Sequence, residues 1–298
     1  MAPDTSDSSD FITGLEISDR LGVLLERAAV LKAGRPGQGA GSLDGRSVAL
    51  IFERPSTRTR VSFEVGVAEL GGTPVVLRSD EMQISRGESL GDVGRVLSRY
   101  VHAIAIRSGS DERVVELADA ADVPVINALT PLHHPCQAIA DLLTLRERFG
   151  ELDGLRLAYV GDGNNVARSL ALLGRHVGLE VVVSSPPGFE LEADAGAELI
   201  GDPSAAVAGA DAVYTDVWLS MSDSDAEAES RREALAPYQL SGDLMAAASD
   251  RAIALHCLPA HPGEEIAADV LYGDRSAVFD QAENRLHAQK ALLELLVA

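Results

Sequence analysis

Short apolar runs alternate along the chain with longer segments whose apolar positions recur at helical spacing. Residues 48–52 and 103–106 are short and almost entirely apolar, which predicts buried strands. Residues 56–70 predict a helix that ends at a glycine pair, and residues 90–101 predict another with its apolar side chains on one face. Strands and helices in alternation are typical of the α/β class with parallel sheets.

The same alternation starts again in the second half of the chain, which predicts a second domain of the same class. We predict two domains, each a parallel sheet flanked by helices, at residues 1–149 and 150–280, with the active site in the cleft between them. An amphipathic C-terminal helix within residues 281–298 is expected to pack back on the first domain. A polar, acidic stretch at residues 222–232 interrupts the second half, and its acidic run is most simply a solvated face.

The composition indicates a globular protein of the reducing cytoplasm. Of the 298 residues 46% are hydrophobic, yet no apolar run approaches the roughly 20 residues that a membrane helix needs. The first ten residues are polar and acidic, unlike a secretory signal. Only two cysteines occur, Cys136 and Cys257, and so sparse a usage argues against a disulfide framework. We therefore expect neither a membrane partner nor export.

The charge balance is strongly acidic. The formal net charge is −21, and the only lysines are Lys32 and Lys290. Such a field disfavours binding to nucleic acid and to anionic membranes. Concentrated salt would screen the self-repulsion, because the Debye length falls to about 3 Å at 1 M. The composition suggests a salt-adapted, halophilic protein from an archaeon; an ordinary acidic bacterial enzyme is the alternative.

Residues 53–60, Glu-Arg-Pro-Ser-Thr-Arg-Thr-Arg, place hydroxyls and guanidinium groups where a predicted strand turns into a helix. The first N–H groups of a helix lack partners and its dipole is positive there, so the turn suits an anion. Arg58 and Arg60 add planar donors that match phosphate geometry. The segment predicts a site for a small phosphorylated substrate. A capped helix with two solvated arginines is the plainer interpretation.

Further polar residues stand at the ends of predicted strands or at the start of a helix. Arg107, Asp216 and the pair His256-Cys257 each follow an apolar strand, and ligands of open parallel sheets bind outside the carboxyl ends of the strands. His134 and Gln137 lie three apart at a helix start, so they share a face and suit polarising a carbonyl group. Helix capping by His134 and turn capping by Asp216 are the alternatives.

Cofactor and metal signals are weak. Cys257 is accompanied neither by a Cys-x-x-Cys pattern nor by histidines at helical spacing, so we expect no metal site. The turn Gly161-Asp162-Gly163 follows a strand and opens a helix, as in dinucleotide-binding folds, but Val166 stands where the third glycine belongs. No acidic residue ends the next predicted strand. We expect no cofactor, and an NAD(P)-dependent oxidoreductase is the alternative from another class.

Taken together, these segments resemble the ornithine carbamoyltransferases of the aspartate/ornithine carbamoyltransferase family. The resemblance covers the chain from about Phe11 to its end. Ser-Thr-Arg-Thr-Arg marks the wider family, whereas His-Cys-Leu-Pro at 256–259 and the pair Ser220-Met221 favour ornithine as substrate. The remaining motifs are His-Pro-Cys-Gln at 134–137, Asp-Val-Trp-Leu-Ser-Met at 216–221 and Ala-Glu-Asn-Arg-Leu-His at 282–287.

The resemblance implies transfer of the carbamoyl group from carbamoyl phosphate to the side-chain amine of L-ornithine, giving L-citrulline in arginine synthesis or breakdown. It implies catalytic roles for some of the residues below and a homotrimer, or a multiple of trimers, in which Gln83 is offered to a neighbouring subunit. The carbamoyl phosphate site would comprise Ser56, Thr57, Arg58, Thr59, Gln83, Arg107, His134, Gln137, Cys257, Leu258 and Arg285. The catalytic residues would be Arg58, Arg107, His134, Gln137, Cys257 and Arg285.

By the same resemblance, ornithine would be bound by Asn165, Asp216, Ser220 and Met221. In the family the Ser-Met pair is usually followed by glycine, whereas Ser222 follows it here, in a loop that closes over ornithine. The nearest alternative keeps the chemistry and changes the amine to putrescine, lysine or an acylated ornithine. A non-catalytic regulatory relative is a further alternative.

Overall fold

The computed structural model describes residues 10–78, 82, 87–219 and 225–298. The chain divides into two compact units. Unit 1 comprises the residues up to Leu143 together with Asn284–Ala298, and unit 2 comprises Thr144–Glu283. The chain therefore passes from unit 1 to unit 2 within helix α5 and returns within helix α11.

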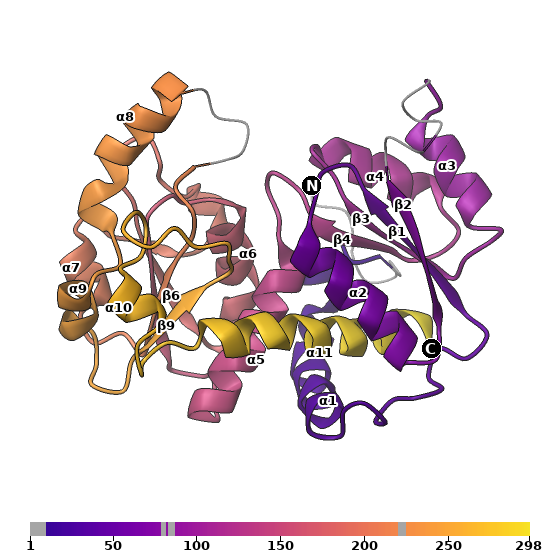
Figure 1. Cartoon of the computed structure of the whole chain (residues 1–298), viewed down its shortest axis with the longest axis horizontal. Helices are drawn as coiled ribbons and strands as arrows, with labels where there is room; N and C mark the ends of the chain where they lie inside the picture. Colours follow the sequence, from indigo (N-terminus) through magenta and orange to yellow (C-terminus); the bar gives the residue numbers. More distant parts are fainter. Residues whose placement is uncertain (1–9, 79–81, 83–86, 220–224) are drawn as a thin grey trace. The chain divides into compact units, whose positions relative to one another are not determined.

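Unit 1 is built on a parallel sheet with strand order β2-β1-β3-β4. One face of the sheet, including Ile51 and Ile104, packs on α3 and α4 to form an apolar core, and these two helices lie side by side (Figure 1). The strands are β1 (Ser47–Phe52), β2 (Thr73–Arg78), β3 (Ala103–Arg107) and β4 (Val125–Leu129). The helices are η1 (Leu15–Arg20), α1 (Leu21–Ala33), α2 (Thr57–Glu69), α3 (Leu90–Leu97), α4 (Asp111–Ala120), α5 (Pro135–Phe149) and α11 (Val278–Val297).

Helix α11 carries an unusual number of buried polar side chains within unit 1. Asn284, Arg285 and Lys290 are at most 4% exposed. Both lysines of the chain serve this helix: Lys32 Nζ donates to Asn284 Oδ1 at 2.8 Å, and Lys290 Nζ donates to Glu69 Oε2 at 2.8 Å. A buried charge is costly unless it is paired, so these contacts fix which residues of α1 and α2 face α11.

The contact between α2 and α11 depends on Gly66. A Cβ atom added at this glycine would lie 3.3 Å from Lys290 Cγ and 3.5 Å from Leu286 Cδ1. The missing side chain lets the two helices approach closely, so the start of α2 and Arg285 on α11 belong to one packed structure.

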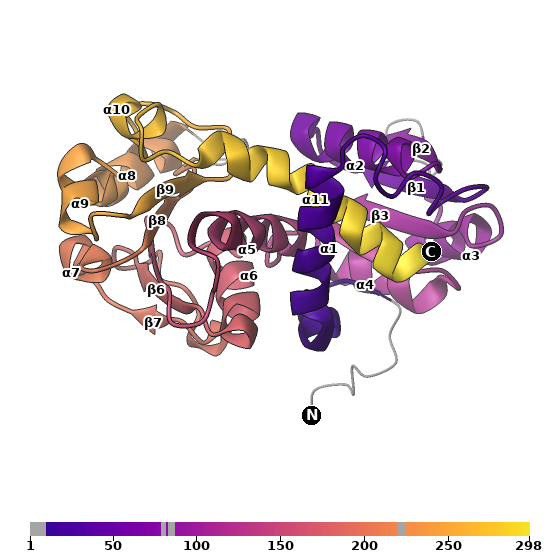
Figure 2. The same ribbon diagram turned by 90° about the horizontal axis from the view of Figure 1, so that it is seen from below.

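Unit 2 has a second parallel sheet, with strand order β7-β6-β5-β8-β9. Figure 2 shows α6 on one side of this sheet and α7 and α9 on the other, where Val213 and Leu244 belong to a shared apolar cluster. The strands are β5 (Arg156–Val160), β6 (Glu180–Ser184), β7 (Glu198–Leu199), β8 (Ala212–Thr215) and β9 (Ile253–His256). The helices are α6 (Asn165–Gly174), η3 (Arg175–Val177), η4 (Ala193–Ala195), α7 (Pro203–Val207), α8 (Asp225–Leu235), η5 (Ala236–Tyr238), α9 (Gly242–Ala247) and α10 (Ala268–Leu271).

The predicted class, α/β with two parallel sheets flanked by helices, is confirmed. Within the polar, acidic stretch at 222–232, the described residues from Asp225 onward form α8, a helix that the sequence pattern did not predict. Alanine, glutamate and arginine are strong helix formers, and the high charge of the segment concealed that preference. The last helix begins at Val278, a few residues before the predicted apolar pattern. Among the described residues, no helix is both long and apolar enough to cross a membrane.

The Glu69–Lys290 pair gives a prediction for stability. Burial alone would raise the pKa of Glu69, but hydrogen bonds from Lys290 and Arg35 outweigh it and hold that pKa below its ordinary value. Glu69→Gln leaves the fully buried Lys290 ammonium without its carboxylate, so we expect a loss of about 3–5 kcal/mol in unfolding free energy. Denaturant titration measures this loss.

The double variant Glu69→Gln with Lys290→Met is the control, because it removes the uncompensated charge and should recover much of the stability. The sign with pH follows from the lowered pKa: the contribution of Glu69 is present above its unfolded-state pKa and is lost as pH falls through its folded-state pKa. A single variant as stable as the wild type would contradict the structural role of the pair.

Candidate functional site

In unit 1 the candidate residues gather at the carboxyl ends of β1, β3 and β4. Ser56 is the residue before α2, but its hydroxyl does not cap the helix. Instead it accepts a hydrogen bond from Arg107 Nη1, at the end of β3, at 3.4 Å. Thr57, Arg58 and Thr59 form the first turn of α2. The first N–H groups of a helix and a guanidinium group thus lie at one edge of the sheet, which suits an anion.

Glu53 holds the ends of β1 and β3 in place, a role that sequence reasoning missed. Its Oε2 accepts from Ser108 Oγ at 2.5 Å, and its Oε1 accepts from Arg113 Nε at 3.0 Å. Its backbone N–H donates to the carbonyl oxygen of Arg107 at 3.0 Å. Burial would raise the pKa of Glu53, but these hydrogen bonds and the Arg113 charge hold it below its usual range. Ionised Glu53 therefore fixes the loop that leads to Ser56.

A second cluster in unit 1 is centred on Gln137 of α5. Gln137 Oε1 accepts from Arg285 Nη1 at 2.7 Å, and Gln137 Nε2 donates to Asp141 Oδ1 at 2.8 Å. Arg285 also donates from Nη2 to Thr59 Oγ1 at 3.3 Å. Arginine can only donate, so the Gln137 amide turns its oxygen toward Arg285 and its NH₂ group toward Asp141. Buried Asp141 was not singled out from sequence, although it lies one helical turn after Gln137.

His134 is buried just before α5, in the field of several arginines. Burial lowers its pKa well below the ordinary value, and the positive charges of Arg285, Arg107 and Arg58 lower it further. His134 is therefore neutral near pH 7 and can act as an uncharged hydrogen-bond donor. In the same motif, burial raises the pKa of the Cys136 thiol to about 12, so Cys136 is an inert core residue and no nucleophile.

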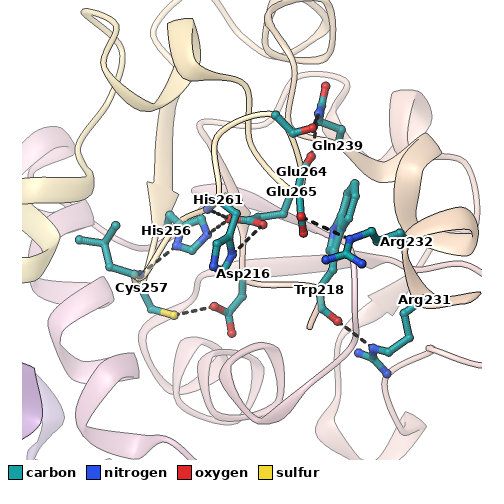
Figure 3. A network of polar contacts seen from close by, with 12 residues as sticks. Asp216, Trp218, Arg231, Arg232, Gln239, His256, Cys257, His261, Glu264 and Glu265 are labelled. Carbon is teal, nitrogen blue, oxygen red and sulfur yellow. Dashed lines mark hydrogen bonds and ion pairs between the residues drawn. The ribbon is translucent and has the colours of Figure 1, made fainter. Parts of the chain in front are cut away.

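Unit 2 places its candidate residues at the carboxyl ends of β5, β8 and β9. Asp216 follows β8, and its Oδ1 accepts from the Cys257 thiol at 2.9 Å (Figure 3). Its Oδ2 accepts from Asn164 Nδ2 at 2.8 Å, and Asn164 Oδ1 accepts from the Tyr159 hydroxyl at 3.0 Å. Asn164, which sequence reasoning passed over, also caps α6 by accepting from the Val166 N–H. The predicted ligand Asn165 is the next residue and begins α6.

Of the remaining predicted site residues, the structure describes Leu258 but not the other three. Leu258 directly follows Cys257 and has a left-handed backbone with φ 61°. Gln83, Ser220 and Met221 lie outside the residues that the structure describes.

In the described part of unit 2, two groups of side chains bring together atoms of the kinds that bind metal ions. Members of both groups already form hydrogen bonds with other protein groups. In the group of Asp216, His256 and Cys257 the ligand atoms lie within 4.8 Å of one another. However, His256 Nδ1 accepts from the Leu258 N–H and Nε2 faces Glu265. The other group comprises His261, Glu264 and Glu265. Metal ligation by His256 would require one of its two hydrogen bonds to break.

The glycine turn after β5 is filled by the chain itself. A Cβ atom at Gly163 would lie 2.3 Å from the Leu191 backbone nitrogen, and the Gly163 N–H donates to the Phe189 carbonyl oxygen at 2.8 Å. In a dinucleotide site the second glycine lets the pyrophosphate approach the backbone. Here residues 189–191 take that space, which argues against the oxidoreductase alternative.

Comparisons with known proteins agree with this division of residues. The family model described as "Aspartate/ornithine carbamoyltransferase, carbamoyl-P binding domain" matches residues 10–147. The model described as "Aspartate/ornithine carbamoyltransferase, Asp/Orn binding domain" matches residues 153–296. Together they span nearly all of the described chain.

Similar proteins include the ornithine carbamoyltransferase of Acidothermus cellulolyticus, which is 54% identical over 92% of this chain and 91% of its own. The solved ornithine carbamoyltransferase structure from Pyrococcus furiosus is 45% identical, with a TM-score of 0.91 over 97% of each chain. The one from Thermus thermophilus is 44% identical, with a TM-score of 0.88 over 94% of this chain and 96% of its own. The chain is a member of the aspartate/ornithine carbamoyltransferase family.

Proposed function

We propose that the protein transfers the carbamoyl group of carbamoyl phosphate to the side-chain amine of L-ornithine, forming L-citrulline and phosphate. The observation that carries the proposal is the gathering of Arg58, Arg107 and Arg285 around buried His134, whose pKa is lowered by burial and by these positive charges. A protein with a net charge of −21 keeps these cations at strand ends beside a helix start, where a doubly charged acyl phosphate would be bound. The ornithine carbamoyltransferases among its relatives support the choice of amine.

The roles of the unit 1 residues follow from their donors and acceptors. Ser56, Thr57, Thr59 and the first N–H groups of α2 would hold the phosphate with Arg58 and Arg107. Neutral His134 would donate to the carbamoyl oxygen. Gln137 turns its Oε1 away from Asp141, so this oxygen would accept from the carbamoyl NH₂ group while Arg285 supports the carbonyl side.

The unit 2 residues would hold ornithine and orient its reacting amine. The carboxylate of Asp216 is held in place and suits an ammonium group, and the Cys257 thiol donates a hydrogen bond to it. Asn165 would contact the amino-acid end of ornithine with Ser220 and Met221, and the Leu258 backbone would line the carbamoyl group. Gln83 would come from a neighbouring subunit.

The reaction needs no covalent enzyme intermediate. The neutral amine attacks the carbamoyl carbon, a C–N bond forms, and the C–O bond to phosphate breaks with its electron pair leaving on phosphate. The proton lost by the amine goes to phosphate or to water. Negative charge grows on the carbonyl oxygen and on the leaving group, and preorganised donors stabilise it most at that point. Holding both substrates in line contributes up to roughly 7–11 kcal/mol.

The direct test is citrulline formation from carbamoyl phosphate and L-ornithine by the purified protein. Putrescine, L-lysine and N-acetylornithine serve as competing amines. We expect ornithine to give the highest kcat/KM, since the relatives with this name share about half of the sequence. Preference for another amine would refute the proposed substrate, and absence of carbamoyl transfer to any of them would refute the reaction.

Arg58→Ala is expected to leave the fold intact and to lower kcat/KM by at least about 100-fold, as for loss of a transition-state donor. Arg58 is solvent-exposed, so little packing is lost. Steady-state kinetics measures the effect. Arg95→Ala is the matched control, because that arginine is exposed on α3 and its ion pair within the described part of the chain is with Asp92 on the same helix, at 3.0 Å. Equal activity of the two variants would remove Arg58 from the phosphate site.

We also propose that the protein is a cytoplasmic homotrimer adapted to concentrated salt. The net charge of −21 and the near absence of surface lysine support salt adaptation. Light scattering in multimolar KCl should give a mass near three times the 31.3 kDa chain, or a multiple of that mass. Dilution into low salt should lower both the mass and the melting temperature, because screening of like charges is lost. A salt-independent monomer would contradict both parts.

A further inference from the structure

The segment after β9 contains two buried polar side chains that the proposed reaction does not use. His256 and Glu265 are both fully buried, and neither is among the residues assigned to substrate. His256 ends β9, whereas Glu265 lies nine residues later, beyond the loop that contains Cys257 and Leu258. Figure 3 shows the two side chains facing each other.

The hydrogen bonds of His256 fix its tautomer. Its Nδ1 lies 2.9 Å from the Leu258 backbone nitrogen, which can only donate, so Nδ1 carries the lone pair. The proton of the neutral ring is therefore on Nε2, which lies 3.2 Å from Glu265 Oε1 and donates to it. Glu265 thus determines which nitrogen of His256 faces the loop.

Leu258 needs such support because its backbone is strained. Its φ of 61° lies in the left-handed region, and among the described residues no other non-glycine has a positive φ. A branched side chain rarely adopts this conformation, and it persists only where the surroundings impose it. The hydrogen bond from the Leu258 N–H to His256 is the contact that holds the backbone there.

Glu265 also ties down the far end of the same loop. Its Oε1 accepts from the His261 backbone N–H at 2.5 Å, and its own carbonyl oxygen accepts from the Leu240 N–H at 2.8 Å. Burial would raise the pKa of Glu265, but the hydrogen bonds from His256 and His261 hold it below its ordinary value. The buried carboxylate is therefore ionised, and it accepts from both ends of the loop 256–261.

We propose that Glu265 is a positioning residue which, through His256, sets the left-handed turn at Leu258 and so presents Cys257 and the Leu258 backbone to the reacting groups. This inference rests on the proposed carbamoyl transfer, in which the loop contacts carbamoyl and amine. Glu265 itself touches no substrate. It acts as a hydrogen-bond acceptor, so an amide oxygen can replace the carboxylate.

The test compares Glu265→Ala, Glu265→Gln and Glu264→Ala in the full chain. Glu265→Ala should lower kcat/KM for ornithine at least about tenfold, as misplacing a supported group by a fraction of an ångström does. Glu265→Gln should recover activity to within a few-fold of wild type, because its oxygen accepts from both donors. Glu264→Ala, which loses the exposed hydrogen bond from Arg232 at 3.3 Å and leaves Glu265 in place, should match wild type.

The binding of inorganic phosphate separates a misplaced loop from a general loss of folding. In the proposal phosphate contacts unit 1, so its dissociation constant should be unchanged in every variant. Wild-type ornithine kinetics in Glu265→Ala would overturn the inference, as would equal losses in Glu265→Gln and Glu265→Ala, or a parallel loss of phosphate binding. An inactive wild type would instead refute the proposed function.

Should Glu265→Ala fail to fold, Glu265→Asp tests the same inference. This variant keeps the charge, but its carboxylate lies one methylene group farther from the His256 and His261 donors. An intermediate loss of kcat/KM at near wild-type melting temperature supports the inference. Wild-type kinetics in this variant overturns it.

Discussion

The burial of Arg285 is the constraint on which the rest of unit 1 depends. A guanidinium group that is 4% exposed is stable only if acceptors surround it. Gln137 and Thr59 supply two of them, from α5 and from the first turn of α2. One side chain on the last helix therefore joins elements that are far apart in sequence. It also sets the orientation of the Gln137 amide, with Asp141 as the opposite support.

The electrostatics of the two units are complementary in kind. Unit 1 gathers arginines around a histidine that they keep neutral, whereas unit 2 presents Asp216, a carboxylate held by a thiol and an amide. The first arrangement suits an anion with a developing oxyanion, and the second suits an ammonium group. A chain with a large negative charge needs such local cations to attract a phosphorylated substrate, since its overall field repels it.

Much of this could be predicted from sequence, because the sheets are parallel and buried. Apolar runs predict their strands, and strand ends predict where Arg107, Asp216 and Cys257 stand. The hydrogen-bond partners of the individual side chains could not be predicted. Asn164, the capping residue before α6, donates a hydrogen bond to Asp216, although only its neighbour Asn165 was singled out from sequence. Glu53, Asp141 and Glu265 act through contacts that depend on three-dimensional packing, and α8 was concealed by its charge.

The close approach of α2 and α11 at Gly66 has a consequence for how this chain can vary. Arg285 and the start of α2 lie on two helices that pack closely at a glycine. Side-chain atoms of Lys290 and Leu286 already lie within 3.5 Å of the place where a Cβ atom of residue 66 would be. A methyl group at position 66 would require the Lys290 side chain to shift by a few tenths of an ångström, and a larger side chain would require more. The proposed anion site is therefore constrained by a glycine that lies outside the residues assigned to it.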